Sequence, residues 1–391
     1  MRRNKELEIY IHIPFCVKKC DYCDFLSGSQ DEATRKIYVE KLIEEIRTHN
    51  KRNRSIHNEK VITVFLGGGT PSILEKNQIT AIFDALRENF DVAEDAEITI
   101  EANPGTVTAE KLQAYKKCGI NRISFGLQST NNEELNLLGR IHTYEEFLES
   151  YQLARACGFH NINVDLISAI PKQTVASWEE TLKKVIVLEP EHISAYSLIV
   201  EEGTPFAKLH GEGCPGEHDL PSEEEERAIY YRTEELLEKA GYHRYEISNY
   251  AKKGKECRHN LGYWERKEYL GIGLGAASLI NNTRYKNTDD LLYYMEHASD
   301  LSAIQENVEK LSLKEQMEEF MFLGLRKMEG VSVDEFENIF GKSMEECYGE
   351  QIQKLKEQGL LEQNDGRLLL TRPGIDVSNY VFGEFLMACQ Y

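Results

Sequence analysis

The chain has 391 residues, which is enough for one large domain and a smaller one. Hydrophobic residues make up 41% of it, so a sizeable core is available and global disorder is excluded. The formal net charge is −20 at pH 7, and we therefore expect no sequence-independent binding of nucleic acid, which needs a positive surface.

The composition also bears on where the protein works. No segment approaches the roughly 18 apolar residues of a membrane-spanning helix, and no apolar segment follows the basic N-terminus, as it would in a signal peptide. Six of the nine cysteines are scattered, as is typical of reduced thiols in a cytosolic protein: Cys118, Cys157, Cys214, Cys257, Cys347 and Cys389. We expect a cytoplasmic protein with at most a peripheral association with a membrane.

The first half of the chain alternates short apolar segments with longer amphipathic ones. This pattern predicts six strands, at residues 9–13, 61–66, 97–101, 121–127, 162–167 and 192–199. It predicts helices between them, at residues 32–49, 75–89, 109–117, 131–157 and 174–188. Strand–helix alternation implies a parallel sheet. Six such units favour a partial (β/α)6 barrel or an open curved sheet over a complete eightfold barrel.

A less regular α+β extension is expected after the barrel. Residues 206–222 are rich in Gly and predict a loop, a helix follows at about 222–240, and residues 245–250 predict a short strand. The next segment, 257–290, contains the sequence Cys-Arg-His-Asn-Leu-Gly-Tyr-Trp and a second glycine-rich stretch. This pattern fits neither a simple helix nor a simple strand.

The C-terminal part predicts a winged-helix-like domain. The pattern becomes helical from about residue 310, Gly359 ends a helix, and residues 360–371 predict a hairpin with an Asp-Gly turn. Winged helices often bind DNA, but several glutamates make this one acidic, so we interpret it as a packing or interaction module. The expected division is a barrel at 1–205, a linker and extension at 206–305, and the helical domain at 306–391.

Three cysteines lie within eight residues, directly after the first predicted strand. Cys16, Cys20 and Cys23 have the spacing C-x-x-x-C-x-x-C. Three thiolates can bind three irons of a 4Fe–4S cluster and leave the fourth iron open to a small molecule that chelates through amino and carboxylate groups. A ferredoxin-type carrier would use four cysteines. A structural zinc site would need a further ligand, and we expect the nearby His12 to be buried in a strand.

Groups suited to ligand binding follow four further predicted strands. Ligands of parallel βα folds lie at the carboxyl ends of the strands. The run Gly67-Gly-Gly-Thr-Pro-Ser72 allows a close approach of the backbone to a ligand. The other candidates are Glu101 and Asp165 for ribose hydroxyls or an amino group, Gln128 as donor and acceptor, and Arg140 for a carboxylate. Each residue alone has an ordinary structural explanation, but together they predict one shared pocket.

These segments resemble the radical S-adenosylmethionine (SAM) superfamily, and within it oxygen-independent coproporphyrinogen III oxidase and its relatives. The resemblance runs from residue 9 to about 205, and the C-terminal module matches too. Its motifs here are Tyr10-Ile-His-Ile-Pro-Phe-Cys16, the three-cysteine motif, Gly67-Gly-Gly-Thr-Pro-Ser72, Glu101-Ala-Asn-Pro-Gly105, Ser124-Phe-Gly-Leu-Gln-Ser129 and Asn163-Val-Asp-Leu-Ile167. The family implies a radical-SAM partial barrel as the fold.

The resemblance also implies cofactors and their ligands. Cys16, Cys20 and Cys23 would bind a 4Fe–4S cluster, and SAM would chelate its open iron. One-electron reduction, by a donor such as flavodoxin or ferredoxin, would cleave SAM to a 5′-deoxyadenosyl radical. The residues implied to line the SAM site are Tyr10, Tyr22, Gly68, Gly69, Thr70, Glu101, Gln128, Arg140 and Asp165, with the two glycines and Thr70 at the methionine part or at a second SAM.

Two departures separate this chain from the oxidases. Their cysteine motif continues to a fourth cysteine, where this chain has Phe25, and they carry an extension ahead of the first strand, which here begins by about residue 9. Both favour the heme chaperone branch, usually called HemW. That branch carries an H-N-x-x-Y-W motif, implied to take part in heme binding and matched here by His259, Asn260, Tyr263 and Trp264. A His can ligate heme iron and aromatic rings can stack on a porphyrin, although a His beside a Trp is more often packed in a core.

The sequence therefore predicts a heme chaperone that carries a 4Fe–4S cluster and SAM and lacks coproporphyrinogen oxidase activity. Its partners would be a heme-accepting protein, such as a respiratory hemoprotein, an electron donor, and a second copy of the chain as a homodimer. The alternative is an enzyme that oxidatively decarboxylates coproporphyrinogen III. A third hypothesis is another radical-SAM reaction on an unknown substrate.

Overall fold

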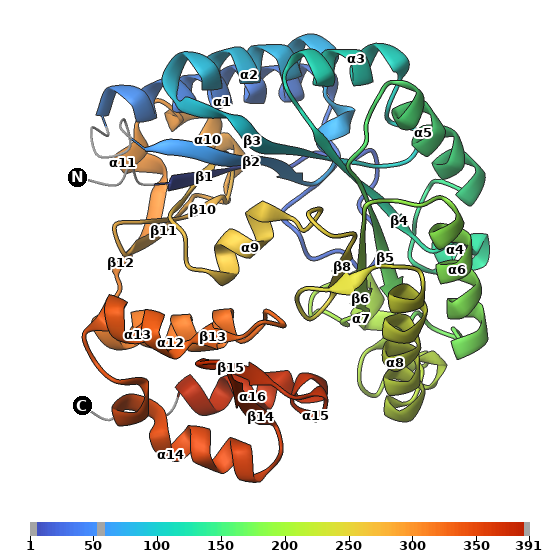
Figure 1. Cartoon of the computed structure of the whole chain (residues 1–391). Helices are drawn as coiled ribbons and strands as arrows, with labels where there is room; N and C mark the ends of the chain where they lie inside the picture. The colour runs from blue at the N-terminus through green and yellow to red at the C-terminus, as the bar shows by residue number, and fades with distance from the viewer. Residues whose placement is uncertain (1–5, 53–58, 387–391) are drawn as a thin grey trace.

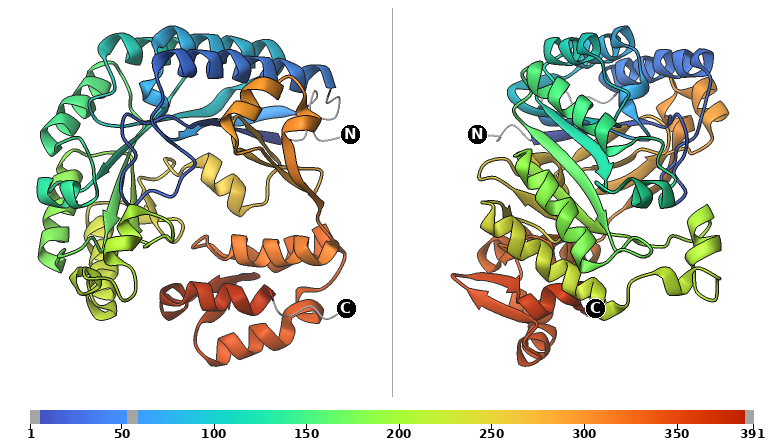
Figure 2. Two further views of the ribbon diagram at one scale, coloured as in Figure 1. Left: turned by 180° about the vertical axis from the view of Figure 1, so that it is seen from behind. Right: turned by 90° about the vertical axis from the view of Figure 1, so that its right-hand side faces the viewer.

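A computed structural model of the chain describes residues 6–52 and 59–386 and shows one large curved sheet beside a smaller helical domain (Figure 1). Cys389 lies outside these ranges. The large sheet has twelve strands in the order β12-β11-β10-β9-β1-β2-β3-β4-β5-β6-β8-β7. Helices cover its outer, convex side, and Figure 2 shows the same layering from behind and from the side. In the described ranges no helix is long and apolar enough to cross a membrane.

The six predicted strands are confirmed, and neighbours among them pair in parallel. They are β1 (Glu6–Ile13), β2 (Lys60–Gly68), β3 (Asp91–Ala102), β4 (Arg122–Gln128), β5 (Ile162–Ser168) and β6 (His192–Ser197). On β1, Ile9, Ile11 and Ile13 are fully buried in the main core. Burial of each such side chain stabilises the fold by about 1.5–3 kcal/mol. The alternate residues of β1, among them His12, which is buried as expected, point the other way along the pleat, toward the inside of the curve.

The connecting helices follow the predicted order with one correction. They are α1 (Glu32–Arg52), α2 (Lys76–Asn89), α3 (Ala109–Lys117), α4 (Asn132–Leu137), α5 (Tyr144–Ala156) and α6 (Val175–Val187). The single helix expected at 131–157 is wrong, because the chain breaks between α4 and α5. Gly139 adopts a left-handed φ of 72°, and Thr143 then starts α5 with a capping box that includes Glu146.

The extension after β6 departs most from the sequence-based expectation. The predicted loop at 206–222 contains α7 (Pro205–His210) and a 3-10 turn, Glu217–Asp219, whereas the predicted helix at 222–240 is confirmed as α8 (Glu223–Lys239). The single strand at 245–250 is wrong. Two short antiparallel strands, β7 (His243–Arg244) and β8 (Asn249–Ala251), flank a turn in which Glu246 accepts hydrogen bonds from the Ser248 backbone and the Asn249 side chain.

The segment 257–290 adds a helix and strands to the far edge of the sheet. The elements are α9 (Arg258–Trp264), β9 (Tyr269–Ile272), β10 (Ala277–Ile280) and β11 (Thr283–Asn287), followed by α10 (Leu291–His297), α11 (Leu301–Ile304) and β12 (Gln305–Lys310). β9 pairs in parallel with β1, so that β1 lies inside the sheet rather than at its edge. Helix α9 lies within the curve of the sheet (Figure 1).

The C-terminal domain has its own hydrophobic core. Its elements are α12 (Leu313–Gly324), β13 (Val331–Ser332), α13 (Val333–Phe340), α14 (Met344–Glu357), β14 (Leu361–Asn364), β15 (Arg367–Leu370), α15 (Arg372–Asp376) and α16 (Ser378–Leu386). The predicted helical pattern and hairpin are confirmed, and β13 adds a third strand on β15. The boundaries proposed near residues 205 and 305 stay predictions.

Candidate functional site

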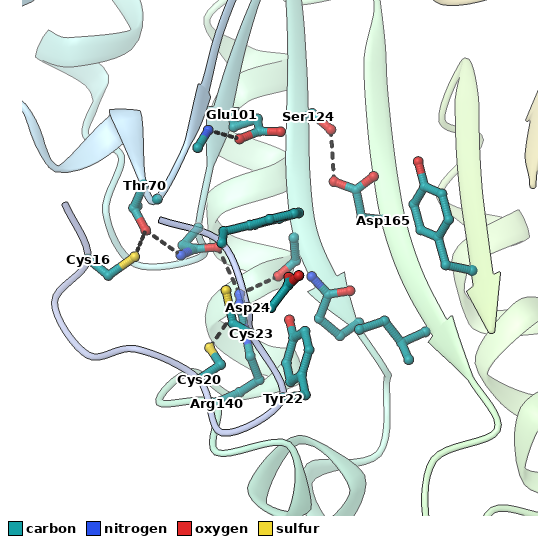
Figure 3. A pocket seen from close by; sticks show the side chains of 18 of the residues that line it. Cys16, Cys20, Tyr22, Cys23, Asp24, Thr70, Glu101, Ser124, Arg140 and Asp165 are labelled. Atoms are coloured by element: carbon teal, nitrogen blue, oxygen red, sulfur yellow. Dashed lines mark hydrogen bonds between the residues drawn. The ribbon is translucent and has the colours of Figure 1, made fainter. Parts of the chain in front are cut away.

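A cavity of about 410 Å³ opens at the carboxyl ends of the parallel strands and beneath the loop that follows β1 (Figure 3). It brings together all the predicted cluster ligands and, except for Tyr10, all the predicted SAM-site residues. These lining residues are Cys16, Cys20, Cys23, Tyr22, Gly68, Gly69, Thr70, Glu101, Gln128, Arg140 and Asp165.

The cysteine loop is closed at its base by backbone hydrogen bonds. The Cys16 N–H donates to the Gly28 carbonyl at 3.0 Å, and the Gly28 N–H donates to the Pro14 carbonyl at 3.0 Å. Within the loop, the Cys23 N–H donates to the Cys20 carbonyl at 3.2 Å. The three half-buried thiols are therefore carried on a loop whose two ends are held together.

Two side chains from other elements donate hydrogen bonds to cysteine sulfurs. The Thr70 hydroxyl donates to Cys16 Sγ and Arg140 Nη1 donates to Cys20 Sγ, both at 3.5 Å (Figure 3). Such donors stabilise the negative charge of a thiolate and tune a bound cluster. The set of three accessible thiols with two sulfur-directed donors suits a 4Fe–4S cluster bound at three of its irons.

The thiols do not converge on one point. Among the described residues, no group of three or more His, Cys, Asp or Glu side chains is placed to hold a single metal ion. Thiolates that each bind a different iron of a cluster need no such convergence. Burial raises the pKa of the Cys23 thiol, so that iron binding there must also displace a proton.

The glycine run after β2 is pressed against the start of the cysteine loop. The Gly69 N–H donates to the Ile13 carbonyl at 2.9 Å, and the Thr70 N–H donates to the Phe15 carbonyl at 2.7 Å. A Cβ atom on residue 69 would lie 2.8 Å from the Phe15 carbonyl oxygen, so that only glycine fits between these backbones. The glycines thus position the cysteine loop as well as lining the cavity.

Two carboxylates lie on neighbouring parts of the wall. The Gly68 N–H donates to Glu101 Oε2 at 3.0 Å, while Asp165 accepts from Ser124 and Asn163, each at 2.8 Å. Burial, followed by the nearby charge of Asp165, raises the pKa of Glu101 to about 8. Glu101 is therefore poised to exchange a proton near neutral pH, and its neighbour Asp165 is oriented to accept hydrogen bonds from hydroxyl or amino groups.

Arg140 is part of the buried wall rather than a surface residue at a helix end. Its Nη2 donates to Asn103 Oδ1 at 2.8 Å and to the Gly126 carbonyl at 2.6 Å, and Asn103 in turn donates to Thr70 Oγ1 at 2.8 Å. The break at Gly139 makes this placement possible, because a Cβ there would lie 2.7 Å from the Asp21 carboxyl group of the cysteine loop. Arg140 thereby joins the strand ends to the cysteine loop.

Gln128 has an unusual backbone. Its φ is 72°, although it is not a glycine, and the β4–β5 register shifts between Gly126 and Gln128. A bulge of this kind redirects a side chain at the end of a strand, and strain of about 1–3 kcal/mol is typically retained where it serves a site. Here it places the amide of Gln128 in the cavity wall.

A second cavity, of about 230 Å³, lies deeper inside the curve and shares Glu101, Ser124, Asp165 and Tyr196 with the first. Tyr10 lines this deeper cavity instead of the cysteine pocket, together with three residues of the H-N-x-x-Y-W motif: His259, Asn260 and Tyr263. The phenol of Tyr10 is hydrogen bonded to His12 Nδ1 at 2.9 Å.

His259 is packed and hydrogen bonded at both ring nitrogens. Nδ1 lies 2.7 Å from the Thr63 hydroxyl and Nε2 lies 3.1 Å from the Tyr263 hydroxyl, while the ring stacks on Phe65. Burial, aided by the charge of Arg122, lowers the pKa of His259 to about 3, so the imidazole is neutral. Ligation of heme iron by this side chain would require breaking one of these hydrogen bonds.

Trp264 lies apart from the other motif residues, because it faces the C-terminal domain. The guanidinium of Arg326, just beyond α12, lies 4.4 Å from the centre of the indole ring, a cation–π contact. Helix α9 therefore presents Tyr263 to the inner cavities and Trp264 to the second domain.

Three further wall residues were not predicted from the sequence: Asn103, Ser124 and Tyr196. Asn103 follows Glu101 by two residues, and Ser124 precedes Gln128 by four. Because every second side chain of a strand lies on the same face, both residues could have been predicted from this two-residue repeat. Tyr196 lies within the sixth predicted strand, 192–199, for which no ligand-binding residue was predicted.

The curved parallel sheet and its three-cysteine loop define a radical SAM protein: residues 10–185 match the model of the Radical SAM superfamily and residues 311–377 match the HemN C-terminal domain. The chain is 40% identical to the heme chaperone HemW of Lactococcus lactis over 97% of both chains. It is 37% identical to that of Bacillus subtilis, over 96% of this chain and 98% of that protein. The chain therefore belongs to the heme chaperone HemW family.

A solved structure shares the whole architecture. Coproporphyrinogen III oxidase (HemN) from Escherichia coli, a radical SAM enzyme, superposes with a TM-score of 0.85 and 25% identity, covering 98% of this chain and 91% of that chain. The predicted α/β partial barrel with a C-terminal domain is confirmed by this likeness.

Proposed function

We propose that this protein is a heme chaperone, which binds heme and transfers it to an acceptor protein while carrying a 4Fe–4S cluster and SAM. The observation that carries the proposal is the full-length match to HemW chaperones in a chain that has Phe25 where the oxidases have a fourth cysteine. Phe25 is 61% exposed at the rim of the cysteine pocket, and it offers an apolar surface in place of a thiol.

The pocket residues would have two kinds of role: some would bind the cluster, and others would bind and orient SAM. Cys16, Cys20 and Cys23 would hold the cluster, which when bound supplies SAM with an open iron and one electron. Gly68, Gly69 and Thr70 would lie along the methionine part of SAM. Arg140 and Gln128 would fix polar groups of the ligand, and Glu101 and Asp165 would accept from its amino or hydroxyl groups; Tyr22 would close the side of the pocket. Tyr10 would act from the deeper cavity through Glu101, which lines both.

The partners follow from this role. The acceptor would be a hemoprotein, such as one of a respiratory chain, and a flavodoxin or ferredoxin would reduce the cluster. The protein would work in the cytoplasm, at times peripherally at a membrane, and as a homodimer. With a net charge of −20, it would not use nucleic acid as a partner.

The alternative is a coproporphyrinogen III oxidase. The observation that favours it is the complete wall of strand-end groups around the cysteine loop, in a fold shared with the oxidase from Escherichia coli. We favour the chaperone because the motif His259–Trp264 and Phe25 accompany the HemW match, and we expect no coproporphyrinogen turnover.

One anaerobic experiment separates the two functions. The full chain is reconstituted with iron and sulfide, titrated with heme by absorbance, and assayed in the same preparation for coproporphyrinogen decarboxylation with SAM and a reductant. We expect about one heme per chain, heme transfer to an apo-hemoprotein, and no decarboxylation. Turnover without stoichiometric heme binding would overturn the chaperone assignment.

A further inference from the structure

A third cavity lies beside the cysteine pocket, and neither the cluster nor SAM would occupy it. Its volume is about 410 Å³, within the range of small-molecule sites, and it lies between β1, the β9–β10 connection and the loop that carries Phe25. It shares Phe25, Gly68 and Glu101 with the cysteine pocket, and Tyr10, Glu101 and Tyr263 with the deeper cavity. The three cavities are therefore neighbours on the inner face of the sheet and share parts of their walls.

The walls of this cavity are mainly aromatic and apolar. Phe25 and Leu26 form one side, and Tyr263 and Tyr269 form another. The two tyrosine rings meet edge to face, with centroids 4.7 Å apart and an interplanar angle of 89°. Aromatic walls of this kind favour a flat, apolar ligand, since ring faces and edges gain dispersion and quadrupole contacts with a second π system.

The wall between these two sides carries almost no side chains. It consists of Gly275, Ala276 and Ala277, and Gly275 has a left-handed φ of 64° with the side chain of Leu26 packed directly over its Cα. Ala277 is exposed, so nothing in the described chain fills the space above it. Leu26 covers Gly275 and Ala276 is buried, so the open part of this wall is Ala277, against which a planar molecule can lie.

Two basic residues neighbour residues that line this cavity, although neither is itself part of the lining. Lys286 is directly opposite Ala277 in the β10–β11 pair, and directly opposed residues share one face of a sheet. Lys19, an exposed residue of the cysteine loop, donates to the Phe25 carbonyl at 2.7 Å. Lys286 Nζ also lies 3.3 Å from Asp289 Oδ2, so a ligand carboxylate would share this cation with Asp289. In a chain with a net charge of −20, two cations near one cavity are the reason to expect a ligand with carboxylates at its rim.

We infer that this cavity is the heme site, an inference that rests on the proposed chaperone function. The macrocycle lies against Ala277, between Phe25 and the tyrosine pair, and its propionates point toward Lys286. His259 does not reach the iron. Its hydrogen bond to the Tyr263 hydroxyl instead holds that ring as a wall of the cavity. Recognition therefore depends on the shape and the rim charge of the tetrapyrrole.

The experiment fills the cavity and compares the result with an equally bulky change elsewhere. Heme and metal-free protoporphyrin are titrated by absorbance into the cluster-loaded full chain, Ala277→Trp, and the control Val308→Trp, at an exposed residue of β12 outside the cavity. We expect Ala277→Trp to weaken both ligands by about tenfold or more and Val308→Trp to leave both unchanged. Lys286→Glu should weaken heme by about threefold to tenfold, and should have a smaller effect on heme dimethyl ester, in which the propionates are uncharged.

Two outcomes decide between this inference and the function on which it rests. If the unmodified chain binds heme and Ala277→Trp binds it equally well, the cavity assignment is overturned and the chaperone function stands. If the unmodified chain binds neither porphyrin, both are overturned. Phe25→Ala, which removes the opposite, exposed wall, is the second variant should Ala277→Trp fail to fold, and it should weaken both ligands by about threefold or more.

Discussion

The cysteine pocket and the heme cavity adjoin each other, but the chain builds them in different ways. The cysteine pocket carries charged side chains, among them Glu101, Arg140 and Asp165, and is assembled from successive βα units of the sheet. The heme cavity is mainly apolar and joins the loop around Phe25 with segments near Tyr263 and Ala277. A regular βα repeat thus produces a site for a charged cofactor, whereas an irregular insertion adds an apolar site next to it.

Helix α9 connects the two regions. Its N-terminus is anchored by Glu97, which accepts hydrogen bonds from the backbone N–H groups of Arg258 and His259, both at 3.2 Å. Its next turn carries Tyr263 at the boundary of the inner cavities, and Trp264 contacts the C-terminal domain through Arg326. If the two regions are independent sites, changes in one should leave ligand binding in the other intact.

The sharpest separation is expected from Cys20→Ser. Loss of one of three thiolates should abolish the cluster and SAM binding, while heme affinity stays within about twofold, because the heme cavity contains no cysteine. Iron and sulfide content and heme titration measure the two properties in one sample. Cys157→Ser, a half-buried cysteine on the outer helical layer, is the control that should keep full iron content. Parallel loss of heme and cluster would show that the regions act as one site.

The next effect concerns the backbone contact beneath the cysteine loop. Gly69→Ala places a methyl group against the Phe15 carbonyl, and we expect it to lower the free energy of unfolding by about 1–3 kcal/mol and to weaken SAM binding. Gly28→Ala, at the other end of the same loop, meets no atom within 4 Å and should change neither. Denaturant titration and calorimetry of SAM binding test the pair, and equal effects of the two substitutions would contradict this packing.

A pH-dependent effect is expected on the α9 side. Glu8 lies beneath Gly262 and is fully buried, and burial raises its pKa to about 9 from an ordinary value of 4.5. The folded state therefore retains a proton that the unfolded state releases, so this carboxyl group lowers stability progressively as pH rises from 4.5 toward 9. Glu8→Gln lacks the titration. Its stability relative to the natural chain should rise by at most about 1.4 kcal/mol per pH unit between about pH 5 and about pH 8.

Denaturant titrations of both proteins at several pH values measure this difference. A gap that is the same across the whole interval would mean that Glu8 titrates normally. Glu296→Gln, at a carboxyl group on α10 away from α9, is a suitable control for the general effect of removing one negative charge.

The smallest effect is expected at the contact between α9 and the second domain. Arg326→Gln removes the cation over Trp264 and should lower the free energy of unfolding by about 0.5–2 kcal/mol. Cluster content should not change, because neither residue lines the cysteine pocket. A heme affinity that falls while the cluster content is unchanged would show that the C-terminal domain acts on the heme cavity through α9.

The cysteine pocket was largely predictable, because a parallel sheet fixes where strand ends meet. Glu101 and Gln128 lie at the ends of predicted strands and Asp165 lies within one, and their grouping in one cavity required only the correct order of those strands. The family likeness predicted that Arg140 lies in this pocket. It did not predict the break between α4 and α5 that positions Arg140 there. The periodicity of 131–157 suggests one helix, and only the contact of Gly139 with Asp21, far away in sequence, explains why it ends.

The heme cavity was not predictable from local pattern. Ala277 and Tyr269 belong to no recognisable motif, and their position depends on β9 pairing with β1, a contact between distant parts of the chain. The same limit explains Trp264. The sequence placed it with His259 in one motif, yet a helix turns successive residues to different sides, and Trp264 faces the other domain.

The pairing of β9 with β1 also has a consequence for how the protein is made. During synthesis β1 is followed at once by its cysteine loop, but its partner Tyr269–Ile272 emerges only after the whole barrel. Until then one edge of β1 is open, and pairing between such distant segments is slow to form. The cysteine loop therefore follows a strand that is paired on both sides only late in synthesis. Iron delivery should succeed on the completed chain and fail on ribosome-bound chains that stop before β9.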